Sequence, residues 1–351
     1  MRELESSAQR TTSSNREPNL SEPQHDISKH EEGFLVTGTL QLSLPVCVTI
    51  IYVPLMLFGL LGNILTILVV WLRPHMRSST YLYLSSMAIS DLLILLLLPL
   101  DLYKLWRPRP WPLGDLACKL TMFLSECCTF CTILHITFLS LERYLAVCWP
   151  ITAKTLVTRR RTRAIIGCLW LGAAVSAAPV LLMVGVEDVG GEEADRRECR
   201  CTQYAISSGL LSAMMILSNL YFLVPLSILG LVYSLIGRTL WLRPKSSRKE
   251  QSHRNTVKML GVIVLAFVLC WLPFHVGRTI FSLSLGSVAA LPYFNLVSSV
   301  LFYLSAAINP LLYNLMSARY RLAVRSLVRR RSQTQAQHLR TLTVRQSTTT
   351  V

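Results

Sequence analysis

The sequence predicts an all-α membrane protein, a seven-transmembrane helix bundle followed by a C-terminal amphipathic helix. Hydrophobic residues make up 52% of the chain and charged residues only 15%, well below the roughly 25% charged residues of soluble domains. The apolar residues gather in blocks with almost no charge, each long enough for a helix to cross a hydrocarbon core of about 30 Å. The blocks form one membrane domain, residues 45–315. They are residues 45–72, 79–104, 116–148, 163–184, 208–241, 256–282 and 291–315.

The distribution of charge predicts the orientation of the bundle. The formal net charge of +16 is compatible on its own with nucleic-acid binding. Basic residues, however, crowd the short connections after the first, third and fifth blocks and the segment after the seventh, whereas acidic residues precede the first block and follow the fourth. Because positive loops stay in the cytoplasm, we expect a multi-pass plasma-membrane protein. Its amino terminus is extracellular, its carboxyl terminus is cytoplasmic, and it has no nucleic-acid partner.

The two ends of the chain lack apolar blocks. Residues 1–44 are predicted to be a disordered extracellular tail, and Asn19 within it fits the glycosylation pattern. Residues 316–329 carry apolar and basic residues at helical spacing, which predicts an amphipathic helix on the anionic inner leaflet. Residues 330–351 are predicted to be a disordered cytoplasmic tail, whose last residues could add a strand to a PDZ domain.

The third block places three features along one helix. Cys118 lies near its outer end, Glu126 lies about 12 Å further in at 1.5 Å per residue, and Glu142-Arg143-Tyr144 lies at the opposite boundary. A single helix would then carry a covalent anchor, a buried charge and a charged motif between the two sides of a membrane. This arrangement suits a device that detects a signal on one side and reports it on the other.

Four charged residues are expected near the outer ends of the helices: Asp101, Lys104, Glu126 and Arg278. A buried carboxylate must be protonated or find a cation, and Arg278 is the basic residue at that level of the sixth block. We therefore predict a Glu126–Arg278 ion pair that divides a ligand cavity, with Asp101 left to take a cationic group of the ligand. The alternative is that the pair only fixes helix packing.

A second polar set is expected at mid-membrane depth: Asn63, Asp91, Thr132, Ser305 and Asn309. A carboxylate in hydrocarbon is costly and needs a partner or a cavity, so these residues are predicted to cluster around Asp91. The cluster could hold a structural sodium ion or water, or Asp91 could be neutral and hydrogen-bonded to its neighbours. No other cofactor and no metal centre is expected.

At the inner face, Glu142 is expected to form an ion pair with its neighbour Arg143, while Tyr233 and Tyr313 supply hydroxyl groups at the same level. Pro273, in the middle of the sixth block, frees a backbone carbonyl and predicts a hinge. Together these residues suggest a latch that opens when Arg143 leaves Glu142.

The motifs of hydrolytic and phosphoryl-transfer enzymes are missing from the sequence, which predicts binding and conformational change rather than catalysis. Three cysteines, Cys118, Cys199 and Cys201, fall on the oxidising exterior, where a disulfide can persist. Either Cys199 or Cys201 could pair with Cys118, but both cannot.

The motifs taken together resemble those of rhodopsin-like (class A) G-protein-coupled receptors. The resemblance covers about residues 45–328 and follows all seven blocks in order. Glu142 stands where many members have Asp. The motifs are Gly62-Asn63, residues 84–91 ending in Asp91, Cys118, Glu142-Arg143-Tyr144, Trp170, Pro225, Cys270-Trp271-Leu272-Pro273 and Asn309-Pro310-Leu311-Leu312-Tyr313.

Within this family, the chain resembles the ghrelin and motilin receptors. The stretches that carry this likeness are residues 99–111, 197–200, 233–238, 271–278 and 302–310. Residues 134–137 and 156–161 look closer to the motilin receptor. The sequence Arg-Glu-Cys-Arg at residues 197–200 favours Cys199 over Cys201 as the partner of Cys118.

The resemblance implies an extracellular peptide hormone, motilin-like or ghrelin-like, as the ligand. It also implies coupling to a heterotrimeric G protein, mainly of the Gq class, which signals through phospholipase C and calcium, together with arrestin and receptor kinases. The expected ligand-binding residues are Asp101, Lys104, Met122, Glu126, Phe274 and Arg278. The expected activation residues are Glu142, Arg143, Tyr144, Tyr233, Phe267, Trp271, Pro273, Pro310 and Tyr313.

Two alternatives come from the same residues. An ion-coupled transporter or channel could use Asp91, Asp101 and Glu126 as an ion path, although the Glu-Arg-Tyr motif and the odd number of spans disfavour it. A neurotensin-like or chemokine-like peptide receptor would share the same fold.

Overall fold

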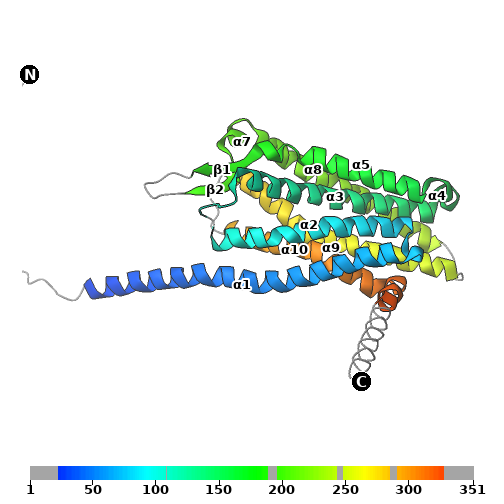
Figure 1. Ribbon diagram of the computed structural model, residues 1–351, viewed down its shortest axis with the longest axis horizontal. Coiled ribbons are helices and arrows are strands. Elements are labelled where there is room, and N and C mark those ends of the chain that lie inside the picture. Colours follow the sequence, from blue (N-terminus) through cyan, green and yellow to red (C-terminus); the bar gives the residue numbers. More distant parts are fainter. Residues whose placement is uncertain (1–22, 108, 189–195, 243–247, 285–290, 328–351) are drawn as a thin grey trace, which may run out of the picture. The chain divides into compact units, whose positions relative to one another are not determined.

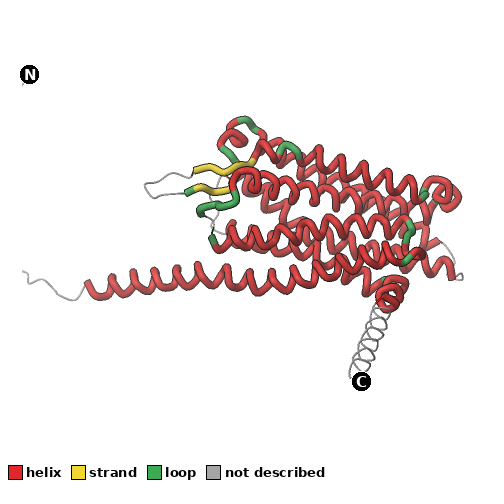
Figure 2. Tube along the Cα trace, in the orientation of Figure 1, coloured by secondary structure: helices red, strands yellow, loops and turns green. Residues whose placement is uncertain are grey.

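The computed structural model describes residues 23–107, 109–188, 196–242, 248–284 and 291–327. The chain divides into two compact units, residues 1–47 and 48–351, and the helix bundle belongs to the second unit. Figures 1 and 2 show that the described part of this unit is almost entirely helical, with one short β-hairpin.

The described residues confirm the seven-transmembrane all-α bundle. Six helices are long and apolar enough to cross a membrane, and residues Leu296–Leu312 form a shorter apolar helix. The spans therefore follow the seven apolar blocks of the sequence. The helices that contain these spans are α1 (Pro23–Leu72), α2 (Ser79–Trp106), α3 (Gly114–Cys148), α5 (Arg159–Ala177), α8 (Leu210–Leu242), α9 (Arg248–Ser284) and α10 (Leu291–Met316).

Several helices begin before their apolar blocks. Helix α1 begins at Pro23, although we expected a tail without helix as far as residue 44, and helix α9 begins at Arg248 rather than at residue 256. Lys, Glu, Gln and Arg have high helix propensities, so a helix can continue through a polar stretch. Apolar blocks therefore mark where the chain crosses the membrane and not where each helix ends.

Helix α3 is the central element of the bundle. It packs against α2, α5, α8 and α9 and also touches the hairpin. In the most apolar 18-residue stretch of α3, 67% of the residues are buried, compared with 22% in the fourth span (Arg159–Met183) and 33% in α8. A side chain on α3 can therefore contact several other helices, which makes it the helix best placed to link them.

The hairpin and the shorter helices connect the spans. Strand β1 (Val184–Asp188) pairs antiparallel with β2 (Arg197–Cys201), with Val184 opposite Cys201 and Asp188 opposite Arg197. The connecting helices are η1 (Pro74–Met76), α4 (Pro150–Leu156), α6 (Val180–Met183) and α7 (Gln203–Ser207).

A short helix over residues 318–327 follows α10, within the range 316–329 expected to be amphipathic. Tyr320, Ala323 and Leu327 are buried on one face. The Tyr320 hydroxyl shares a hydrogen bond of 2.9 Å with Thr66 Oγ1 of α1. Burial raises the pKa of the Tyr320 hydroxyl, so this group keeps its proton and holds the short helix against the bundle.

Helices α1 and α10 meet at Pro310. Proline has no N–H, so the carbonyl of Ala306, four residues earlier, loses its helical donor. Asn63 Nδ2 donates to this carbonyl at 3.0 Å and to the Gly59 carbonyl at the same distance. A Cβ on Gly62 would lie 2.8 Å from Pro310 Cβ, so the close approach of the two helices requires glycine there.

We expect Gly62→Ala to destabilise the protein, because its Cβ would overlap Pro310 and overpacking costs about 1–3 kcal/mol. Gly167→Ala is the matched control, since a Cβ on this helical glycine meets no atom within 4 Å and Ala favours a helix by about 1 kcal/mol. The measurement is thermal unfolding of the two purified variants in one detergent. Equal melting temperatures would contradict the proposed close approach.

Candidate functional site

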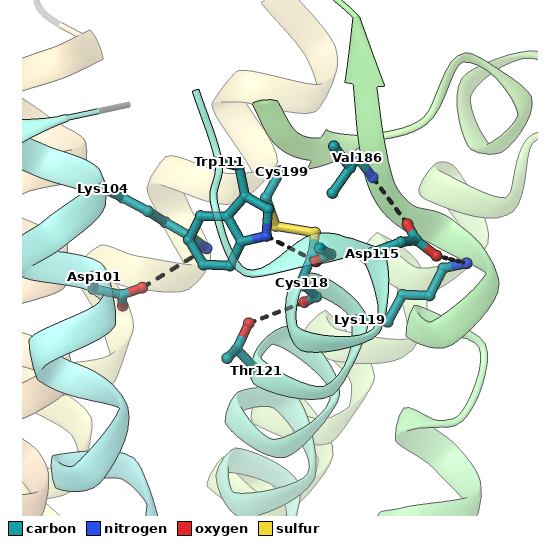
Figure 3. Close-up of a disulfide and its surroundings, with 10 residues drawn as sticks. Asp101, Lys104, Trp111, Asp115, Cys118, Lys119, Thr121, Val186 and Cys199 are labelled. Atoms are coloured by element: carbon teal, nitrogen blue, oxygen red, sulfur yellow. Dashed lines mark hydrogen bonds and ion pairs between the residues drawn. A yellow bond between two sulfur atoms is a disulfide. The ribbon is translucent and has the colours of Figure 1, made fainter. Parts of the chain in front are cut away.

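The outer end of α3 is fixed by a disulfide and a carboxylate. Cys118 is joined to Cys199 of β2, whereas the Cys201 thiol donates a long hydrogen bond of 3.9 Å to the Thr202 carbonyl. Asp115 accepts a hydrogen bond of 3.0 Å from the Val186 backbone N–H and pairs with Lys119 at 2.6 Å, as Figure 3 shows. The hairpin is therefore held over α3 on both of its strands.

Lys104 extends from the end of α2 toward this anchor. Its Nζ lies 4.0 Å from Asp101 Oδ1 and 5.0 Å from the centre of the Trp111 ring (Figure 3). Trp111 is held in place because its backbone N–H donates to the Arg197 carbonyl at 2.8 Å and its Nε1 donates to the Gly114 carbonyl at 2.9 Å. The Trp111 ring and the Asp101 carboxylate thus hold Lys104 in position, and both are favourable neighbours for an ammonium group.

Asp101 has partners within the chain. Besides Lys104, it accepts a hydrogen bond from the Tyr303 hydroxyl of α10, and the Tyr303 ring lies 5.2 Å from the ring of Tyr52 in α1. We expected Asp101 to remain available for a cationic group of a ligand, and the structure differs. Lys104 is three residues further along the same helix, and residues at this spacing share a helix face.

Glu126 lies in α3 below the disulfide and is 8% exposed. Met122, one turn further out, is partly buried beside the packed side chains of α3, α5 and α8. The side chain of Arg278 lies outside the described residues, so the Glu126–Arg278 ion pair stays a prediction. Asn19 also lies outside the described part of the chain.

Aromatic residues surround the kink of α9 at Pro273. The Trp271 ring, 1% exposed, lies 6.0 Å from Phe267, 5.8 Å from Phe274 and 5.3 Å from Phe302 of α10. The sequence pointed to Phe267, Trp271, Pro273 and Phe274, and the structure brings them together. It adds Phe302, whose position in a long apolar block carried no distinguishing signal.

This aromatic group extends to α8 through Phe222. The Phe222 ring stacks on His275 at 4.6 Å and lies 6.1 Å from Phe267. The part of α9 around Pro273 therefore contacts α8 and α10 through these rings, and Thr279 further along α9 shares hydrogen bonds with Asn219 of α8 at 3.0 and 3.3 Å.

Each side chain of the mid-membrane polar set has a hydrogen bond within the chain, and Thr132, Ser305 and Asn309 line one small cavity. Asn309 Nδ2 donates to Asp91 Oδ2 at 2.9 Å, and Thr132 shares a hydrogen bond of 3.0 Å with Ser90. Ser305 donates to the backbone carbonyl of Phe302 at 2.6 Å. Asn63, as described above, binds backbone carbonyls of α1 and α10.

A cavity of about 10 Å³ lies beside these residues, lined in part by Thr132, Ser305, Asn309 and Trp271. A volume of this size holds about one water molecule. Hydroxyl and amide oxygens suit water or a hard cation such as sodium, so the lining fits either occupant.

At the inner face, Glu142 binds three hydroxyl groups. It accepts hydrogen bonds from Ser79 of α2, from Tyr83 of α2 at 3.0 Å and from Thr162 of α5 at 3.4 Å. Ser79 and Thr162 also share a hydrogen bond of 2.7 Å. One carboxylate thus joins the inner ends of α2, α3 and α5.

The expected Glu142–Arg143 ion pair is absent among the described residues. Adjacent residues of a helix point in directions about 100° apart, and the Glu142 carboxylate binds hydroxyl groups of α2 and α5, although its charge still acts on Arg143. The buried Nε–H of Arg143 has no hydrogen-bond acceptor in the described part of the chain, and the Tyr233 hydroxyl is one of its electrostatic neighbours.

The remaining inner residues lie nearby. Tyr144 packs with α8 residues and accepts a hydrogen bond of 3.5 Å from Trp149 Nε1. Pro310 lies within α10, and the Tyr313 side chain is not among those described. The latch proposed from the sequence therefore has a different closed form, in which Glu142 belongs to the α2–α3–α5 joint.

A second joint among the same helices is built on His135. A carbonyl can only accept, so the 2.7 Å contact between His135 Nδ1 and the Cys131 carbonyl places the proton on Nδ1. His135 Nε2 then accepts from Ser86 Oγ at 2.9 Å, and Ser86 accepts from Trp170 Nε1 at 2.9 Å. This joint was not predicted from the sequence, although a histidine inside an apolar block was a signal for it.

Comparisons with known proteins identify relatives of this chain. The chain is 54% identical to the growth hormone secretagogue receptor type 1 of Sus scrofa, over 80% of each chain. It is 43% identical to the motilin receptor of Homo sapiens, again over 80% of each chain. It is 33% identical to the neurotensin receptor type 1 of Rattus norvegicus, over 79% of this chain and 74% of the relative.

These identities correct one preference drawn from the sequence. Two short stretches favoured the motilin receptor, but the identity with growth hormone secretagogue receptors, 52% for the protein of Homo sapiens, exceeds the 43% with the motilin receptor. Short motifs carry few residues, and the rest of the chain outweighs them.

The family described as 7 transmembrane receptor (rhodopsin family) matches residues 62–313. This range runs from the close contact of α1 with α10 to the end of the Asn309–Tyr313 motif, and so includes both inner joints and the aromatic group around Pro273. The relatives are receptors and not enzymes. The chain belongs to the rhodopsin family of seven-transmembrane receptors.

Proposed function

We propose that this chain is a plasma-membrane receptor for a peptide hormone of the ghrelin and motilin type. The observation that carries the proposal is the 54% identity with a growth hormone secretagogue receptor over 80% of both chains. The buried carboxylate of Glu126 beneath the disulfide-anchored hairpin supports it, because a buried charge is a group that a ligand can compete for.

The proposed orientation places the amino terminus outside the cell and the carboxyl terminus in the cytoplasm. The support is the concentration of Lys and Arg after the first, third, fifth and seventh blocks. Signalling is proposed to run mainly through a Gq-class protein to phospholipase C and calcium, with arrestin and receptor kinases acting on the cytoplasmic side. Asn19 is the proposed glycosylation site, and the last residues of the chain are a proposed PDZ ligand.

The proposed signal passes from Glu126 to α9. Glu126 and Arg278 form an ion pair in the resting receptor, and the peptide replaces one of the partners, which frees α9 to move at Pro273. The ring contacts of Trp271 and Phe222 allow this movement. The Glu142 and His135 joints hold α2, α3 and α5 as the fixed part against which α9 moves.

Glu126→Gln is expected to abolish calcium release evoked by acyl-ghrelin or motilin, since the neutral side chain cannot pair with a buried cation and the loss of such a pair costs about 3–5 kcal/mol. The measurement is calcium mobilisation in transfected cells, with surface expression determined in parallel. Glu198→Gln is the matched control, because Glu198 pairs with Arg109 at 3.2 Å near the surface and such pairs contribute about 0–1 kcal/mol. Wild-type potency of Glu126→Gln would rule out the proposed trigger.

Glu142→Ala is expected to lower the apparent melting temperature of the purified receptor by at least about 3 °C. The change leaves the Tyr83 hydroxyl buried without its acceptor, at about 1–3 kcal/mol. Thr155→Ala serves as the control, since this exposed hydroxyl donates only to the carbonyl of Thr152 in its own helix. A melting temperature equal to that of Thr155→Ala would show that Glu142 does not join the helices.

The Asp91–Asn309 contact and the cavity beside it are proposed to hold a sodium ion or water. If sodium binds there, raising its concentration lowers agonist affinity in the wild type and has no effect in Asp91→Asn, which lacks the charge that attracts the ion. Radioligand binding at constant ionic strength, with choline replacing sodium, measures this. An unchanged sodium effect in Asp91→Asn would leave water as the occupant.

A further inference from the structure

The outer segment of α9, which follows Pro273, is joined to its neighbours at two points within one helical turn. At the first, Asn219 Nδ2 of α8 donates a hydrogen bond of 3.0 Å to Thr279 Oγ1. At the second, the buried Gly277 lies against the ring of Phe294 in α10, and a Cβ on this glycine would lie 2.2 Å from Phe294 Cε1. The ring therefore occupies the space of a Cβ, and glycine is required for this contact.

The hydroxyl group of Thr279 forms a short chain of hydrogen bonds. A hydroxyl has one hydrogen to donate, and Thr279 Oγ1 lies 2.8 Å from the His275 carbonyl, which can only accept. Thr279 therefore donates to His275 and accepts from Asn219, and the 3.3 Å contact with Asn219 Oδ1 is the longer of the two between α8 and α9. The pair is partly buried, where a polar group left without a partner is costly. It is therefore a firm joint between the two helices.

The two joints lie on opposite sides of α9, and the interior of the bundle lies between them. Each residue advances about 100° around a helix axis, so Thr279 lies about 200° from Gly277, and Arg278 lies between them. Trp271, seven residues before Arg278, lies within about 20° of the same direction. Because Trp271 is buried, the backbone of Arg278 lies on the face of α9 that points into the bundle.

The ring contacts of α9 agree with this orientation. Phe274 lies on the side of the glycine joint by the same rule, and its ring stacks with Phe302 of α10 at 6.0 Å. His275 lies on the side of the hydrogen-bonded joint, and its ring stacks with Phe222 of α8 at 4.6 Å. Helices α10 and α8 thus border the outer segment on two sides, with the face of residue 278 between them.

The proline in α9 explains why a precise site needs such joints. Pro273 has no N–H, so the carbonyl of Leu269 loses its helical donor, and the outer segment is less firmly coupled to the rest of the helix. A rotation of this segment by about 20° would move a Cα by about 0.8 Å at the helix radius of about 2.3 Å. Binding groups must be held within about 0.5 Å of their productive geometry. The joints with α8 and α10 supply the rigidity that the proline removes.

We propose that these two joints, together called the outer clamp, position Arg278 for the peptide ligand. This inference rests on the proposed function, in which Arg278 pairs with Glu126 and the peptide replaces one of the two. The residues of the clamp carry no charge, so they act through the placement of Arg278 and not through an attraction of their own. The outer clamp consists of Asn219 and Thr279 on the α8 side and of Gly277 and Phe294 on the α10 side.

An exchange of side chains tests the hydrogen-bonded joint. Asn219→Thr leaves two short side chains apart and Thr279→Asn crowds two longer ones. Each is expected to lower the affinity for radiolabelled acyl-ghrelin or motilin about fivefold, the contribution of one hydrogen bond. The double variant, in which the two side chains have changed places, is expected to return to within about twofold of the wild type. The measurement is peptide binding to membranes of transfected cells, with surface expression determined in parallel.

The double variant separates positioning from a general loss of folded receptor, because it contains both substitutions and regains the hydrogen bond. Binding as weak as that of the single variants would overturn the proposal. Wild-type affinity of both single variants would overturn it as well, since the joint would then have no effect on the ligand site.

Gly277→Ala tests the joint with α10. The added Cβ displaces the Phe294 ring, and the peptide affinity is expected to fall at least about fivefold, as for the loss of the other joint. Gly230→Ala is the matched control, because a Cβ on this helical glycine of α8 meets no atom within 4 Å. Equal affinities of the two variants at equal surface expression would contradict a role for this contact in positioning.

A distance measurement tests the clamp without a hormone. Spin labels are attached to a ketone-bearing amino acid at the exposed positions Leu220 of α8 and Val276 of α9, which leaves the native cysteines unlabelled. Electron–electron double resonance of the purified full-length receptor is expected to give a broader distance distribution in Asn219→Thr than in the wild type, and a narrow one again in the double variant. An unchanged distribution in Asn219→Thr would overturn the clamp. If the wild type binds neither peptide, the proposed function fails, and this measurement still decides whether the clamp holds α9.

Discussion

A polar group inside hydrocarbon must find its partner within the protein, because no water is there to replace it. This constraint explains most of the contacts between the helices. Pro310 leaves the Ala306 carbonyl without its donor, and Asn63 supplies one from α1. Glu142 brings a carboxylate to the inner end of α3, and hydroxyl groups of α2 and α5 surround it. Asn63 and Glu142 therefore each fix the relative position of two or more helices.

The constraint also divides the bundle into a rigid part and a part free to move. The polar joints of Glu142 and His135 lie among α2, α3 and α5. Around Pro273, by contrast, the rings of Phe222 in α8 and Phe302 in α10 meet those of His275 and Trp271 in α9. Displacing a ring costs little beyond packing, whereas separating a buried hydrogen bond costs about 1–3 kcal/mol per group left unpaired. The rings around Pro273 therefore oppose a movement of α9 less than its hydrogen bonds with α8, which join Arg254 to the Leu240 carbonyl and Thr279 to Asn219.

The sequence predicted which segments span the membrane, because that depends on composition. The Arg-Glu-Cys-Arg motif of the resembling receptors favoured the Cys118–Cys199 disulfide, and the apolar blocks showed which polar residues lie inside the spans. The sequence did not predict which polar residues pair. Glu142 and Arg143 are neighbours in the chain, yet Glu142 accepts its hydrogen bonds from α2 and α5, while Asp101 pairs with Lys104 on its own helix face and with Tyr303 from α10. Pairing depends on the rotation of each helix about its axis, and a row of apolar residues facing both lipid and protein leaves that rotation undetermined. Cys199 and Cys201 show the same limit, since alternate residues of a strand share a face and only the register of the hairpin separates them.

The free energy available from the proposed exchange of partners at Glu126 can be compared with the free energy needed to shift the receptor from one state to another. Moving an equilibrium from about 1:99 to about 99:1 needs a ligand that binds one state more tightly by about 5.5 kcal/mol. Separating one buried ion pair changes the energy by about 3–5 kcal/mol, so the exchange of partners at Glu126 alone falls short of a full switch.

The difference must come from further contacts made in only one state, and Lys104 can supply one of them. Its ammonium group is buried and has no hydrogen-bond acceptor in the described part of the chain, so an acceptor on the ligand would add a charge-assisted hydrogen bond of about 1.5–3 kcal/mol. With Lys104 as one of the proposed ligand-binding residues, the two contacts together reach the energy that a nearly complete switch requires, and the proposal then gives Lys104 a part in activation as well as in binding.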